Sequence, residues 1–474
     1  MELPRMIRRI VFAVSFLVLL ASASAHAQAL LEPPPPAPPA PSAQAEAIGR
    51  MNSIPALMAQ GQQYQQAGDW ASYALVLQRL IKLRPFLGVL RYELAAAYAM
   101  QDMKPESYDS LVRLQGSGYA YDIAADQRFK NVHGTELWTF LLENFSNNGR
   151  QFGSGKVVAT LPKGDNLHES VAWDPKSGSF LVGSARKGTI VRIAAGGEPQ
   201  DFIAPDAANG LWGVFDLVAD PARDALWVAS GASVLTPHAK PEDYGRSGVF
   251  RFRLSDGGFV SKTLLPADGQ NHLLTALAVT PQGLVFAIDS VSNRLLKVEG
   301  EGFRVVVQNP QLGRLRALAA TDDGKTLYFS DYELGLFGID LASGKGFDVA
   351  TNERVSLEGI DRLAWYQGHL LVLQNGFKPN RAMRFAVSPD GRKVIANQAL
   401  DASQPAWSAP TGGTLAGDRF VFIADSQRGL LDAYGNVRDP DQLAPVELWS
   451  SDARLAWNVQ VDDDALAGAK KSAE

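Results

Sequence analysis

Polar and charged side chains recur at one place in a pattern repeated along the second half of the chain. The first example is Glu169, which precedes an apolar run at residues 171–173 and a turn at residues 174–178. A carboxylate placed there can ligate a hard cation, or it can be the polar start of a strand. The remaining members are Asn166 and His168; Phe215 and Asp216; Asn271, His272 and Thr275; Arg314 and Arg316; Glu358 and Asp361; and Thr411 and Thr414. Such a set can hold a cation or a charged ligand, provided that the fold brings its members together.

The elements that position these residues form a sixfold repeat. Each copy has a short apolar run, a turn and a second apolar run: SVAWDPKSGSFLVGS, DLVADPARDALWVAS, ALAVTPQGLVFAIDS, ALAATDDGKTLYFSD, RLAWYQGHLLVLQN and GGTLAGDRFVFIAD. The turns fall near Asp174, Asp220, Thr280, Asp322, Tyr366 and Ala416, at intervals typical of four-stranded propeller blades. We therefore predict a mainly β fold, a six-bladed β-propeller over residues 151–460. The innermost strands of such a ring begin at one mouth of the central channel, so the polar set should converge there.

The segment GSGKVVATL, residues 153–161, has two interpretations. It looks like part of a phosphate-binding loop, but it lacks the first glycine at the required spacing and the Ser or Thr after the lysine. We predict instead that it is the strand that closes the ring. A closed ring leaves no long sheet edge, which suits a chain with no cysteine and hence no disulfides.

Two of the repeats resemble a known family. HESVAWDPKSGSFLVGS looks like the first blade of the gluconolactonase and senescence-marker-protein family, in which a glutamate precedes a tryptophan by four residues, as Glu169 precedes Trp173. ATDDGKTLYFSD is similar to that family's fourth blade. The resemblance implies that Glu169 ligates Ca²⁺ or another divalent cation. It also implies that an acid, Asp216 or Asp361, assists the water that attacks a sugar lactone.

The sequence departs from the family at the other metal positions. The family's metal-binding asparagines fall on Thr275 and Arg316, and the fifth-blade acid, Glu358 or Asp361, lacks the family's Pro-Asp-Gly setting. An arginine repels a metal ion but binds a carboxylate or phosphate. Two functions follow, and the sequence leaves open whether the protein is an enzyme.

The first function is the binding of a small anionic ligand or a protein partner at the channel mouth, with a degraded metal site. Its candidate ligand-binding residues are His168, Asn271, His272, Arg314, Arg316 and Glu358. The alternative is a divalent-metal-dependent lactone hydrolase with Glu169 as metal ligand and Asp216 and Asp361 as catalytic residues. Pairing of Arg316 with Glu358 or Asp361 would be a purely structural use of the same charges.

The N-terminus has the pattern of a signal peptide, residues 1–27. Three arginines precede an apolar run at residues 10–20, and small residues at 25–27 offer a cleavage site. The apolar run is short for a membrane span, although an uncleaved anchor is the alternative. We therefore expect a periplasmic or secreted protein with no stable membrane insertion after leader removal.

Two further segments separate the leader from the propeller, and a third follows the propeller. Residues 28–49 are proline-rich and are expected to be a disordered, extended spacer. Residues 50–150 have helical periodicity, with breaks at Gly68 and Asp102, 34 positions apart, and resemble tetratricopeptide repeats. This helical module is either a partner-binding groove or a structural cap on the propeller. Residues 461–474 are expected to be a flexible tail.

Composition limits the function classes. The 474 residues are 46% hydrophobic and 20% charged, with a net charge of −5. These values are typical of a soluble protein with a large core, and an acidic chain without basic clusters is not expected to bind nucleic acid.

Overall fold

The computed structural model describes residues 42–194, 196–352 and 354–454. The predicted signal peptide, most of the predicted spacer and the predicted tail lie outside these residues. The chain divides into two compact units between Met51 and Asn52. The described part of the first unit is helix α2 (Ala43–Arg50), which Ser42 caps by accepting a hydrogen bond from the Ala45 amide at 3.1 Å. Residues 43–49, expected within the extended spacer, are therefore helical instead, because a serine cap precedes an alanine-rich run.

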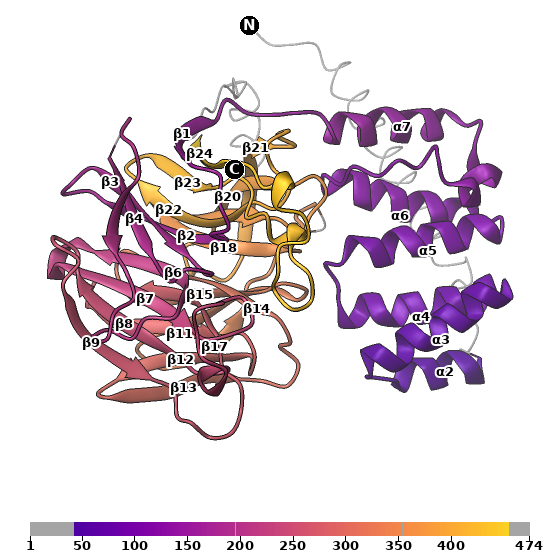
Figure 1. Cartoon of the computed structure of the whole chain (residues 1–474). Helices are drawn as coiled ribbons and strands as arrows, with labels where there is room; N and C mark the ends of the chain where they lie inside the picture. The colour runs from indigo at the N-terminus through magenta and orange to yellow at the C-terminus, as the bar shows by residue number, and fades with distance from the viewer. Residues whose placement is uncertain (1–41, 195, 353, 455–474) are drawn as a thin grey trace, which may run out of the picture. The chain divides into compact units, whose positions relative to one another are not determined.

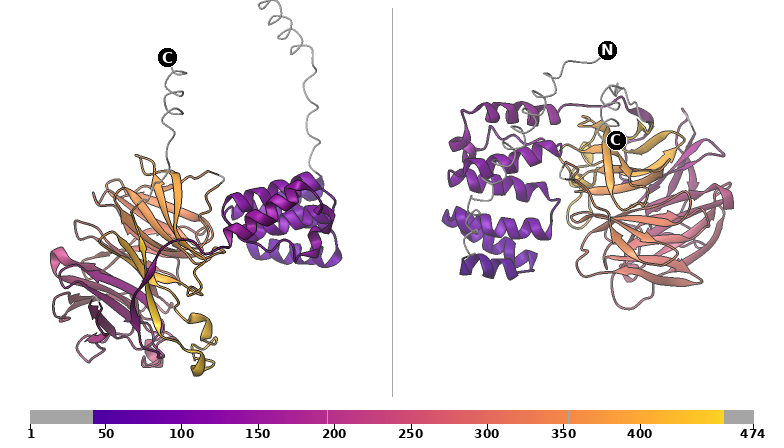
Figure 2. Two further views of the ribbon diagram at one scale, coloured as in Figure 1. Left: turned by 90° about the horizontal axis from the view of Figure 1, so that it is seen from above. Right: turned by 180° about the vertical axis from the view of Figure 1, so that it is seen from behind.

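The second unit begins with a stack of helices (Figures 1 and 2). They are α3 (Ile54–Ala67), α4 (Trp70–Leu83), α5 (Gly88–Met100), α6 (Lys104–Gly116), the 3₁₀ helix η1 (Gln127–Val132) and α7 (Glu136–Asn148). Gly68, with φ of 71°, ends α3, and Asp102, with φ of 57°, separates α5 from α6, so both predicted breaks are confirmed. Each of α4 to α7 packs against the helix before it. In the part of the chain that is described, no helix is both long and apolar enough to cross a membrane.

The rest of the second unit is a six-bladed β-propeller, as the repeat predicted. Five blades are meanders: β2 (His168–Asp174), β3 (Ser179–Ser184), β4 (Ile190–Ala194), β5 (Gln200–Ile203); β6 (Gly213–Asp220), β7 (Ala225–Gly231), β8 (Ser247–Arg253), β9 (Phe259–Leu264); β10 (Leu274–Val279), β11 (Val285–Asp289), β12 (Arg294–Glu299), β13 (Gly302–Gln308); β14 (Leu315–Ala320), β15 (Thr326–Asp331), β16 (Gly335–Asp340), β17 (Gly346–Asp348); β18 (Ile360–Tyr366), β19 (His369–Gln374), β20 (Arg381–Val387), β21 (Val394–Ala402). Short 3₁₀ turns lie at η2 (Pro221–Arg223) and η3 (Pro241–Asp243).

The sixth blade closes the ring. It comprises β22 (Thr411–Ala416), β23 (Arg419–Ile423), β24 (Val446–Asp452) and, at its outer edge, β1 (Lys156–Leu161) from the other end of the propeller. The segment that looked like part of a phosphate loop is thus the closing strand. The turns η4 (Arg428–Leu430) and η5 (Pro440–Gln442) lie between β23 and β24.

Separate apolar cores lie between the blades. Each innermost strand packs against the innermost strand of the next blade, and β22 packs against β2. Between blades one and two, for example, Leu181 and Val214 are fully buried together with Phe250. Because the sheets are joined face to face by these cores, the starts of the six innermost strands are fixed around one axis.

Candidate functional site

The innermost strand of every blade begins with an irregularity in its pairing to the second strand. The register shifts lie between His168 and Ser170, Val214 and Asp216, Leu274 and Ala276, Leu315 and Leu318, Ile360 and Arg362, and Thr411 and Thr414. A β-bulge leaves a residue unpaired and re-aims its side chain. In the sixth blade two glycines, Gly412 and Gly413, occupy the bulge with positive φ.

The residues at these bulges line one cavity. Each blade contributes one of them, and they are Glu169, Phe215, Thr275, Arg316, Asp361 and Thr411. All six belong to the polar set that the sequence predicted at the channel mouth. The cavity has a volume of ≈ 100 Å³ and is completed by Leu235, Leu273, Ser290, Arg362 and Arg428.

The charges in the cavity wall are partly paired. Arg428 donates from Nε to Oε1 of Glu169 at 3.2 Å, and Thr411 donates from Oγ1 to Oδ2 of Asp361 at 2.8 Å. Burial raises the pKa of Glu169, and Asp361 adds to the rise while Arg428 opposes it. Within residues 42–194, 196–352 and 354–454, Arg316 has no carboxylate at ion-pair distance. Its guanidinium lies 5.5 Å from the Tyr332 ring centroid.

Arg362 in the cavity wall belongs to a buried ion pair. Arg362 donates from Nη1 to Oδ2 of Asp216 at 2.9 Å, and the two side chains are 9% and 1% exposed. Asp216 also accepts the amides of Leu217 and Leu277 at 2.9 and 2.7 Å. Among the described residues, the hydrogen bonds of this predicted catalytic carboxylate go to Arg362 and these two amides, and it does not line the cavity, whereas Asp361 does.

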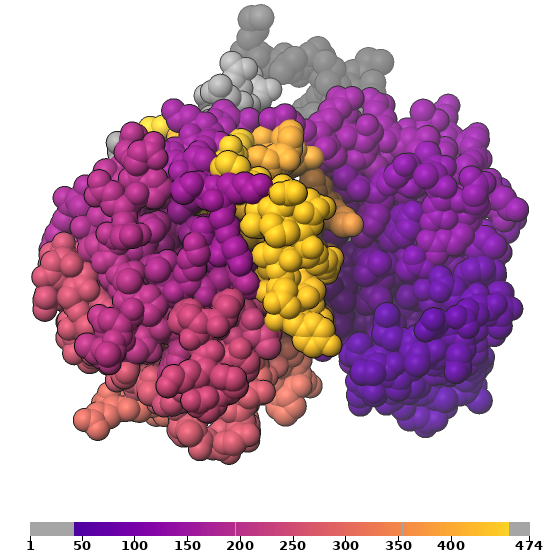
Figure 3. Space-filling view, in the orientation of Figure 1, coloured from indigo at the N-terminus to yellow at the C-terminus, as the bar shows by residue number. Residues whose placement is uncertain are grey.

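Two loops cover the cavity with apolar side chains. Leu235 belongs to the insertion between β7 and β8, and Leu431 to the loop between β23 and β24; both pack in a cluster with Phe215 and Leu273. The β23–β24 loop lies on the face shown in Figure 3, where its atoms are yellow. Electrostatic interactions beside such apolar side chains are stronger than in bulk solvent.

The cavity residues do not fit the divalent ion that the family resemblance implies. Ca²⁺ prefers six or more oxygen ligands, but the cavity offers two carboxylates, one of them already paired with an arginine. The guanidinium groups of Arg316, Arg362 and Arg428 line the same space and repel a cation. Across the described ranges, no group of three His, Cys, Asp or Glu side chains is placed to hold a metal ion.

Four other predicted ligand-binding residues lie outside the cavity wall. His168 is 4% exposed, with Nδ1 3.1 Å from the Gly183 carbonyl oxygen, and burial lowers its pKa to about 4. His272 is buried, with Nδ1 2.7 Å from Oδ2 of Asp289. Arg314 is exposed and pairs with Glu333 at 3.2 Å. Asn271 is exposed, and its side chain lies against Gly245.

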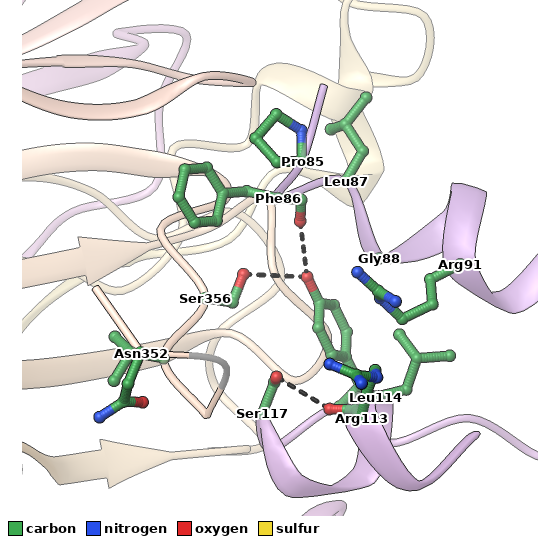
Figure 4. Close-up of a pocket in the computed structure, with 12 residues that line it drawn as sticks. Pro85, Phe86, Leu87, Gly88, Arg91, Arg113, Leu114, Ser117, Asn352 and Ser356 are labelled. Atoms are coloured by element: carbon green, nitrogen blue, oxygen red, sulfur yellow. Dashed lines mark hydrogen bonds between the residues drawn. The ribbon is translucent and has the colours of Figure 1, made fainter. Parts of the chain in front are cut away.

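Glu358, the fifth of these residues, joins the propeller to the helices. Its Oε2 accepts the Gly88 amide of α5 at 3.1 Å and contacts the Tyr119 hydroxyl. That hydroxyl is also 3.0 Å from the Phe86 carbonyl oxygen and 3.0 Å from Ser356 Oγ. In Figure 4 both interactions are dashed lines that end on the labelled Phe86 and Ser356. Glu358 is thus an anchor at the edge of the helical module, and it does not pair with Arg316.

Sequence reasoning missed the arginines that complete the wall. Arg362 follows the predicted Asp361 directly, so the inner-strand pattern contained it. Arg428 lies in a loop 259 positions from Glu169, and no local pattern marked it.

Three of the repeats end in an aspartate that stabilises the turn after it. Asp289, Asp331 and Asp425 accept hydrogen bonds from backbone amides of the turns that follow them.

Known proteins share the propeller fold. The chain matches no model of a known family and no curated protein. Similar solved structures include the PQQ-bound aldose sugar dehydrogenase of Streptomyces coelicolor (15% identity, 64% of this chain and 100% of that chain, TM-score 0.42). They also include a gluconolactonase of Xanthomonas campestris (12%, 65% and 92%, 0.43) and virginiamycin B lyase of Staphylococcus aureus (12%, 63% and 99%, 0.38). At these identities the likeness concerns the fold alone.

Proposed function

We propose that the protein binds a small anion in the cavity at the channel mouth. The observation that carries this proposal is Arg316, a cationic side chain in the wall of a covered cavity with no carboxylate partner in the described part of the chain. A guanidinium binds a carboxylate or phosphate through two parallel hydrogen bonds, and this geometry makes arginine the preferred residue for such groups.

Two further polar atoms support a bound ligand. Thr275 Oγ1 and Arg362 Nε are buried and have no hydrogen-bond partner within the described ranges. Buried polar atoms almost always have a partner, either in the protein or in a bound molecule or water. Both residues belong to the cavity wall, so these unpartnered atoms lie beside the proposed ligand site.

Size and cover favour a small ligand over a protein partner. The volume of ≈ 100 Å³ suits a molecule of a few non-hydrogen atoms, and apolar residues of two loops lie over it. The metal-dependent lactone hydrolase is the less favoured function, because three arginines occupy the surroundings that a cation would need. In this proposal the metal site of the resembling family is degraded, and the arginines have converted it to an anion site.

Calorimetric titration with acetate tests the proposal. Wild-type protein should bind acetate, and Arg316→Gln should weaken binding about tenfold or more, as expected for loss of a charge-assisted hydrogen bond. Arg314→Gln is the matched control, because Arg314 is two positions away, exposed and paired with Glu333. Equal affinities of wild type and Arg316→Gln, or no acetate binding to wild type, would contradict the proposal.

We also infer from the N-terminal pattern that this binding takes place outside the cytoplasm. N-terminal sequencing of the exported protein should begin after residue 27, and a start at Met1 would favour the anchored alternative.

A further inference from the structure

Two opposite charges in the cavity wall are left without an ionic partner. Glu169 pairs with Arg428, and Asp216 pairs with Arg362. Arg316 has no carboxylate partner among the residues that the structure describes. Asp361 likewise has no cation at ion-pair distance there, and its carboxylate accepts a hydrogen bond from the hydroxyl of Thr411.

This balance favours an anionic ligand that also carries a positive charge, and such a ligand should bind more tightly than a simple anion. A simple anion on Arg316 would share the small, covered cavity with the carboxylate of Asp361. Two negative charges in one small cavity repel each other. A ligand with one charge of each sign would satisfy both groups and leave the cavity neutral.

We infer that the ligand is a small zwitterion, an α-amino acid with a short side chain. Its carboxylate binds Arg316 and its ammonium binds Asp361. This inference rests on the proposed anion site and specifies its ligand class. The α-carbon of an amino acid carries both charges within one small group, as a cavity of ≈ 100 Å³ requires.

The apolar part of the wall fixes the side-chain class. Phe215, Leu235 and Leu273 form an apolar part of the cavity wall. Their uncharged side chains suit contact with a methyl group of the ligand. The same volume excludes long side chains, so alanine is the best probe among the common amino acids.

A three-ligand titration of wild-type protein tests the inference. L-alanine carries both charges, propionate lacks the ammonium group and ethylammonium lacks the carboxylate. L-alanine should bind about tenfold or more tightly than propionate, since its ammonium group makes a charge-assisted hydrogen bond to Asp361 that propionate cannot make. Ethylammonium should show no measurable binding.

Variants of Asp361 and Arg316 test which residue binds which charged group of the ligand. Asp361→Asn should weaken L-alanine binding about tenfold and strengthen propionate binding, because it removes a like charge. Arg316→Gln should weaken both ligands, and Arg314→Gln neither. If propionate binds as tightly as L-alanine, the inference of a zwitterionic ligand is wrong, but the proposed anion site is still supported. Absence of binding by both ligands would overturn the anion site as well. If Asp361→Asn does not fold, the titration of wild-type protein with the three ligands still tests the inference.

Discussion

Asp216 on β6 and Arg362 on β18 form a 2.9 Å ion pair that joins blades two and five across the central channel. Both side chains are buried, so each charge depends on the other for compensation. Their pairing explains why one of the predicted catalytic acids does not serve the cavity. It also holds Arg362 in position as part of the cavity wall.

Asp216→Asn should destabilise the protein by about 3 kcal/mol, because it leaves the Arg362 charge buried without its partner. The asparagine can still accept one of the two backbone amides. Denaturant unfolding measures the loss. The double variant Asp216→Asn, Arg362→Met should recover part of the stability, and a fully additive loss in the double variant would contradict the pairing.

Glu358 should contribute more to stability than Glu333, although both contact residues of the helical module. Glu358 is buried against Gly88 and Tyr119, whereas Glu333 pairs with Arg84 at a partly exposed site. Glu358→Ala leaves buried donors unsatisfied and should cost about 2 kcal/mol. Glu333→Ala should cost less than about 1 kcal/mol. Thermal unfolding of the two variants compares them, and equal losses would show that Glu358 is not an anchor.

His168 should make the protein less stable in acid. Burial lowers its pKa to about 4, below the ordinary value of 6.5, so the folded protein holds the imidazole neutral. The stabilisation is complete above pH 6.5 and is lost as pH falls toward 4, by about 3 kcal/mol in total. His168→Gln should show a correspondingly flatter dependence of unfolding free energy on pH between 7 and 4. The same slope in both proteins would refute this assignment.

Much of the fold was predictable because its signals are local. Turns near Asp174, Tyr366 and the equivalent positions mark the six inner hairpins, since strand alternation and turn chemistry act over a few residues. The convergence of Glu169, Arg316 and Asp361 followed from the ring architecture.

Side-chain direction at the strand starts was not predictable. A bulge shifts the register by one residue, so the alternation along the strand does not tell which of two neighbours, such as His168 and Glu169, faces the channel. The contacts of Glu358 and Arg428 depend on segments distant in sequence, namely helix α5 and the β23–β24 loop. A single sequence contains no information on contacts between residues that lie so far apart in the chain.

Calcium should not stabilise the protein. Three arginines line the space where the resembling family would hold the ion, so addition of Ca²⁺ to chelator-treated protein should leave the unfolding temperature unchanged. The measurement is a thermal scan with and without the ion, on wild type and Glu169→Gln. An upward shift in wild type that disappears in the variant would restore the metal site.

The location of a bound anion tests the central claim most directly. Crystals equilibrated with bromide, a small anion with a measurable anomalous signal, should show a difference peak inside the cavity next to the Arg316 guanidinium. Arg316→Gln crystals under the same conditions should lack that peak. Bromide found only on the outer surface of the wild-type protein, with the cavity empty, would contradict an anion site at the channel mouth.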